Sequence, residues 1–171
     1  VELEDVRLMV PLSRKGVVWE ISRALERRDT VRAIRLVDAQ LERGESAIGL
    51  MRAAIIPTVR NLFMVRVLLD AHPDLPLHNG NSFSSALNRL PDGEKAWLPR
   101  TKNGSVNAWG LFFAARKAGQ FTTGEMHHAL EAVLQADKSL VTTQLDPRMV
   151  LHRLVAGLAM GGTRKPKRKS A

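Results

Sequence analysis

The histidines are the first residues to consider as candidates for chemistry. His127 and His128 are adjacent and follow Glu125 closely, and His152 lies further along the chain. Neighbouring residues on a helix diverge by about 100°, so we expect the pair to point in different directions rather than at one metal ion. The zinc-protease pattern HExxH is also absent. The sequence therefore favours structural histidines and predicts no metal site.

Motifs that bind phosphate or supply a nucleophile are also missing. The chain contains neither GxxxxGK[ST] nor GxGxxG. Residues 161–165 place basic side chains after two glycines, but they follow a predicted helix rather than a strand. There is no GxSxG elbow. There is no cysteine either, which excludes disulfides, thiolate metal sites and a cysteine nucleophile. We therefore expect no catalytic residue, no cofactor and no metal in this chain.

Aromatic and basic residues occur together between positions 97 and 117. They are Trp97, Trp109, Phe112 and Phe113, with Arg100, Lys102, Arg116 and Lys117 near them. One interpretation is a platform on which nucleic-acid bases stack while the cations contact phosphates. The other is an amphipathic helix with core aromatics and a solvated basic face. We favour the second, because Trp109, Phe112 and Phe113 fit one helical stripe.

The net charge of +9 is concentrated at the C-terminus. Five cations and no acid lie in residues 161–171, so +4 remains for the other 160 residues once they are subtracted. These cations are Arg164, Lys165, Lys167, Arg168 and Lys169. We expect this tail to be disordered. It is either a nonspecific DNA contact or a solubilising end, and the sequence does not favour one over the other.

Helical periodicity extends along the whole chain and predicts an all-α helical bundle. Tyrosine is absent, and no segment keeps the apolar–polar alternation of a strand. The expected helices cover residues 3–10, 15–27, 31–43, 45–71 and 106–117, with one from Asn81 or Ser82 to Leu90, one from Thr122 or Thr123 through Leu140 and one from Pro147 to Gly161. Apolar residues point in most directions along 45–71, which predicts a central, buried helix.

Capping residues and breakers set the expected helix boundaries. Asp29 or Thr30 caps the helix that follows it, Asp146 precedes a first-turn proline, and Gly44 supplies a left-handed exit. Pro57 lies inside the longest helix and predicts a kink or break near residues 53–56.

The chain shows no sign of a membrane segment or a secretion signal. It has no run of about 18 uninterrupted apolar residues, which argues against a membrane span. Its first residues have no basic region followed by an apolar one, so they are not a signal peptide. We therefore expect a cytoplasmic protein.

Helix-packing motifs recur along most of residues 1–160. They include Val17-Val18-Trp19-Glu20-Ile21, Leu41-Glu42-Arg43-Gly44-Glu45, Arg60-Asn61-Leu62, Asp146-Pro147-Arg148 and Leu154-Val155. In this order they resemble the family of the bacterial DNA polymerase III delta subunit, a component of the clamp loader. The chain departs from that family at Val141, where the family tends to have lysine, and at residues 91–104.

The resemblance implies a non-catalytic role in DNA replication. Residues 1–13 would end a lid-type middle domain, and residues 14–160 would form the helical collar through which clamp-loader subunits assemble. The partners would be subunits of the gamma/tau and delta prime type, with DNA reached through the assembled complex. The resemblance further implies that the ATPase-like N-terminal domain of the family would be missing from this chain. The alternative is a helical nucleic-acid-binding protein that uses a basic face and the tail.

Overall fold

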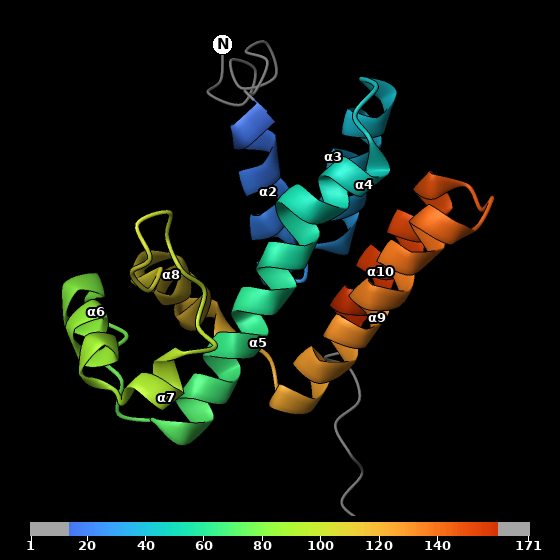
Figure 1. Ribbon diagram of the computed structural model, residues 1–171. Helices are drawn as coiled ribbons and strands as arrows, with labels where there is room; N and C mark the ends of the chain where they lie inside the picture. The colour runs from blue at the N-terminus through green and yellow to red at the C-terminus, as the bar shows by residue number, and fades with distance from the viewer. Residues whose placement is uncertain (1–13, 161–171) are drawn as a thin grey trace, which may run out of the picture.

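The computed structural model describes residues 14–160, and these residues form helices joined by loops (Figure 1). The helices are α2 (Arg14–Glu26), α3 (Thr30–Glu42), α4 (Ala47–Leu50), the π-helical turn η1 (Met51–Ile55), α5 (Ile56–Ala71), α6 (Gly80–Arg89), α7 (Asp92–Lys95), α8 (Ala108–Ala118), α9 (Thr123–Thr142) and α10 (Pro147–Met160). Within this range the only pairing of extended backbone is one isolated bridge, between Arg100 and Val106. The all-α prediction is confirmed. The expected helix at 3–10 and the basic tail lie outside the described residues.

The continuous column α4–η1–α5 lies at the centre of the bundle (Figure 1). Helices α6, α7 and α8 lie on one side of α5, and α9 and α10 lie on the other. Met51, Ala54, Ile55 and Val65 are fully buried along this column. The prediction of a central, buried helix over 45–71 is therefore confirmed.

This column also has the composition of a membrane-spanning helix. Ala47–Ala71 is long and apolar enough to cross a membrane, although no run of 18 apolar residues exists in the sequence. By itself this is weak evidence for a membrane span, because core helices of soluble proteins have the same composition. Here the column packs against α2, α8 and α9, where its apolar side chains form the core.

Pro57 interrupts the regular α-helical bonding of the column near residues 53–56, where a kink or break was predicted, but the helix continues through a π-helical turn. A proline has no N–H to donate, so the regular bond from position 57 to the Ala53 carbonyl cannot form. The chain adapts with a π-helical turn, in which the Ile56 amide donates to the Met51 carbonyl five residues earlier. The Thr58 hydroxyl reaches back to the Ala54 carbonyl at 2.7 Å. The side chains after the break are therefore reoriented relative to those before it.

Most helix ends follow the expected caps. Asp29 accepts the Arg32 amide at 3.0 Å, Gly44 has a φ of +84°, and Thr122 forms a capping box with Glu125 at the start of α9. Helix α6 begins earlier than expected. Asn79 caps it by accepting the amides of Asn81 and Ser82, the two positions at which the sequence placed the start.

Candidate interaction surfaces

The histidine pair does not diverge as expected. His127 Nδ1 lies 3.8 Å and His128 Nδ1 lies 3.1 Å from carboxylate oxygens of Glu131, and the three ligand atoms lie within 4.8 Å of one another. The prediction that the two rings point apart is therefore wrong, because both bend toward the glutamate one turn later. All three side chains are exposed on a single helix. His152 does not join them and instead contacts Asp38 at 2.8 Å.

The aromatics of α8 are split between core and surface. Phe112 is buried against Phe83, as a core aromatic should be. Trp109 and Phe113 are 52% and 46% exposed. The interpretation of all three as core residues is therefore right for Phe112 and wrong for the other two. Trp19 of α2 is 57% exposed and lies 6.4 Å from Phe113 between ring centroids. We call Trp19, Trp109 and Phe113 the aromatic cluster.

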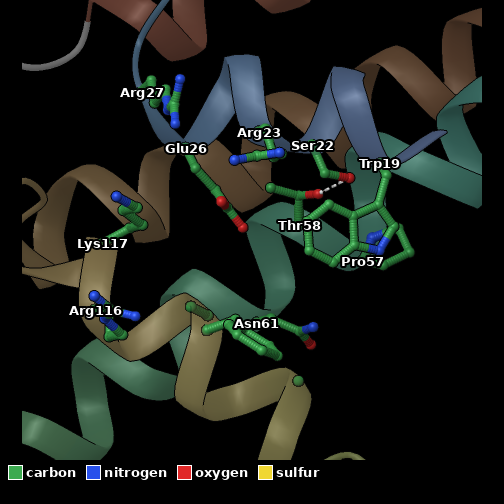
Figure 2. A pocket seen from close by; sticks show the side chains of 13 residues that line it. Trp19, Ser22, Arg23, Glu26, Arg27, Pro57, Thr58, Asn61, Arg116 and Lys117 are labelled. Carbon is green, nitrogen blue, oxygen red and sulfur yellow. Dashed lines mark hydrogen bonds between the residues drawn. The ribbon is translucent and has the colours of Figure 1, made fainter. Parts of the chain in front are cut away.

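A cavity of about 400 Å³ adjoins this cluster between α2, α5 and α8 (Figure 2). We call it the aromatic–basic pocket. It is lined by Trp19, Ser22, Arg23, Glu26, Arg27, Pro57, Thr58, Asn61, Gly110, Phe113, Ala114, Arg116 and Lys117. Four of these residues are basic and one is acidic. The Arg23 guanidinium lies 5.6 Å above the Trp19 ring, in the range of a cation–π contact.

Polar groups on α2 and α5 line one side of the pocket. Thr58 and Ser22 share a hydrogen bond of 2.9 Å (Figure 2). Asn61 Oδ1 is buried and accepts no hydrogen bond from any described residue. Burial raises the pKa of Glu26, while Lys117, Arg23 and Arg27 act in the opposite direction. The pocket therefore has a positive field, and an unpaired amide oxygen lies buried in its wall.

The basic residues grouped by the sequence do not gather in one place. Arg116 and Lys117 line the aromatic–basic pocket. Arg100 does not, and its guanidinium donates to the Gly104 carbonyl at 2.9 Å within its own loop. Trp97 and Lys102 are also exposed outside the pocket. The five tail cations, Arg164, Lys165, Lys167, Arg168 and Lys169, lie outside the described residues. Trp19 and Arg23 of α2, with Arg27 just after that helix, complete the pocket from about 90 residues away in sequence.

A second surface with exposed apolar side chains belongs to the α9–α10 hairpin. Leu134 and Val141 are 65% and 61% exposed and lie seven residues apart, on one side of α9. Leu145 in the connecting loop and Met149 on α10 are also exposed. A groove of about 420 Å³ runs between the two helices, with Ala136, Leu145, Val150 and Leu154 among its walls. The hairpin therefore presents apolar area that this chain leaves uncovered.

Comparison with known proteins gives one informative match. No family model matches the chain, and no curated protein matches it. Among solved structures, the DNA clamp loader delta protein (YqeN) of Bacillus subtilis is similar, with a TM-score of 0.61 and 16% sequence identity. The alignment covers 93% of this chain and 40% of that protein. At this identity the match shows a shared fold. The chain is therefore folded like part of a bacterial clamp loader delta protein.

Proposed function

We propose that this chain is the helical collar region of a delta-type clamp-loader subunit and joins subunits without catalysing a reaction. The carrying observation is that nearly the whole chain takes the fold of less than half of a clamp loader delta protein. In this proposal residues 14–160 form the collar, residues 1–13 end a preceding lid-type domain, and residues 161–171 are an added basic tail. The protein then acts in DNA replication in the cytoplasm.

We infer that the α9–α10 hairpin contacts the partner subunits, which are of the gamma/tau and delta prime type. Burial of its exposed apolar side chains at an interface would contribute favourable free energy of binding. Burying a leucine or valine side chain completely is worth roughly 1.5–3 kcal/mol, so two residues that are about 60% exposed supply roughly 2–4 kcal/mol. Each 1.4 kcal/mol changes affinity about tenfold.

Co-purification with partner subunits tests this proposal. The full chain is mixed with gamma/tau-type and delta-prime-type subunits of the same cell. The molar mass of the complexes is then measured by light scattering after gel filtration. We expect a stable complex, and Val141→Asn should weaken it roughly tenfold. The matched control is Val31→Asn on α3, because Val31 is also a valine with 61% exposure but lies outside the hairpin.

Two results would count against the proposal. If no complex forms with either subunit type, the chain is not a collar despite its fold. If a complex forms but Val31→Asn weakens it as much as Val141→Asn, the α9–α10 hairpin is not the interface. Circular dichroism of both variants confirms that each is folded before affinities are compared.

A further inference from the structure

We propose that the aromatic–basic pocket binds an acidic peptide segment that inserts one bulky apolar side chain between α2, α5 and α8. This inference does not depend on clamp-loader assembly. The pocket is formed by helices other than the α9–α10 hairpin, and the two surfaces share no residue. A collar can therefore be occupied at both at the same time.

The pocket has unsatisfied groups that a ligand would complete. Trp19 and Phe113 keep about half of their surface in water, although both lie against the cavity. Asn61 Oδ1 is buried there without a donor, and a buried polar atom left unpaired is costly to stability. This atom has almost no accessible surface, so a ligand N–H reaches it only if the Asn61 side chain turns toward the cavity.

The charges around the pocket select an anionic ligand. Among the described residues, Arg23, Arg27, Arg116 and Lys117 form no ion pair within 4.0 Å, and Glu26 is the one acid in the lining. Figure 2 shows Arg27, Lys117 and Arg116 on one side of the pocket and Trp19 on the other. Carboxylates that flank an inserted apolar side chain would reach these cations. An arginine can bind a carboxylate in bidentate fashion.

The ring geometry favours a peptide over a nucleic-acid base. A base needs a free, parallel ring face on which to stack. The Trp19 and Phe113 planes meet at 71°, and the Arg23 guanidinium lies above the Trp19 ring. Trp109 does not line the cavity and instead packs over Gly80. Two walls at a steep angle suit edge-to-face contact with an aromatic or aliphatic side chain.

Fluorescence anisotropy with defined peptides tests the inference on the full chain. The probes are labelled peptides with tryptophan, phenylalanine or leucine at the centre and three aspartates on each side. The comparison probes have alanine at the centre, or lysine in place of aspartate. We expect the apolar-centred acidic peptides to bind, and at least one of them to bind at least tenfold more tightly than the alanine and lysine probes.

Variants locate the binding. Phe113→Ala should weaken the acidic peptide about tenfold, and Arg27→Gln and Arg116→Gln should each weaken it severalfold and reduce its salt dependence. Trp97→Ala and Arg35→Gln are the controls, because both residues are exposed outside the pocket. These two should leave the affinity unchanged.

Three outcomes would overturn the inference. One is that no acidic peptide binds up to millimolar concentration. Another is that binding survives Phe113→Ala, as attraction to the basic tail alone would. The third is that an oligothymidine of about twelve nucleotides binds more tightly than every peptide and loses its affinity in the Phe113→Ala variant. That result would make the pocket a binding site for single-stranded nucleic acid.

Discussion

Arg28 joins three helices and offers a quantitative test of the packing. It lies between α2 and α3, and its guanidinium donates to the Gln120 carbonyl at 2.8 Å and to the Glu125 carboxylate at 3.3 Å. It also lies 4.2 Å from the centre of the Phe121 ring. Glu125 is the residue that completes the capping box of α9. Removing the side chain therefore loosens the start of α9 from the α2–α3 turn.

The backbone of Arg28 adds a second, separable effect. Its φ is +56°, a left-handed conformation that costs an L-residue about 1–2 kcal/mol. Arg28→Ala keeps this cost and loses the side-chain contacts. Hydrogen bonds to a charged group contribute about 1.5–3 kcal/mol, and the partial exposure of Arg28 and Glu125 reduces that contribution. We therefore expect Arg28→Ala to lower the free energy of unfolding by about 2 kcal/mol. Arg28→Gly loses the same contacts but relieves the strain, so it should be about 1 kcal/mol more stable than Arg28→Ala.

Thermal and urea unfolding followed by circular dichroism measure both differences, with Arg35→Ala as a control that has no comparable contacts. For a chain of this length each kcal/mol corresponds to about 2–4 °C in Tm, so Arg28→Ala should melt roughly 4–8 °C lower. Equal stability of the alanine and glycine variants would refute the strain argument. An unchanged Arg28→Ala variant would show that the contacts to α9 contribute nothing.

Three further predictions concern the pocket, the contact between Gly80 and Trp109, and the core. Burial raises the pKa of Glu26 above its ordinary value of 4.5, so the native state loses stability as the pH rises and this carboxyl group ionises. Urea titrations should therefore show Glu26→Gln gaining stability relative to the parent between about pH 4 and pH 7. A Cβ on Gly80 would lie 2.5 Å from the Trp109 ring, so Gly80→Ala should destabilise the parent by about 1 kcal/mol but not a Trp109→Ala background, as a double-mutant cycle measures. Phe83→Ala should cost about 3–5 kcal/mol in thermal unfolding, because Phe83 is fully buried.

Local signals in the sequence were sufficient to predict most of the fold. A cap such as Asp29 or Thr122 acts on amides within three residues, so the sequence alone contains both partners of the hydrogen bond. The break at Pro57 is equally local, because the missing donor belongs to the proline itself. Asn79 was missed because two further capping residues, Asn81 and Ser82, follow it after Gly80, and only the backbone geometry distinguishes them.

The aromatic–basic pocket could not be predicted in the same way. Periodicity shows that Trp109, Phe112 and Phe113 share a stripe, but not how wide the buried part of that stripe is. Phe112 is covered by Phe83 of α6, whereas Trp109 contacts the same helix at Gly80 and still keeps half of its surface exposed. Trp19 meets Phe113 through the packing of α2 and α8 around α5, a long-range contact with no local signal. The sequence does contain the basic residues of both helices, but nothing in it places them together.

The break in the central column also explains why a pocket exists at this position. Pro57 and Thr58 follow the π-helical turn directly and both line the cavity, and Asn61 lies one turn further along the same side of α5. In an uninterrupted α-helix this side of the column would be rotated relative to α2 and α8. The proline that interrupts the backbone thus helps set which side chains of α5 line the cavity. We infer that the break is a feature of the binding surface as well as of the core.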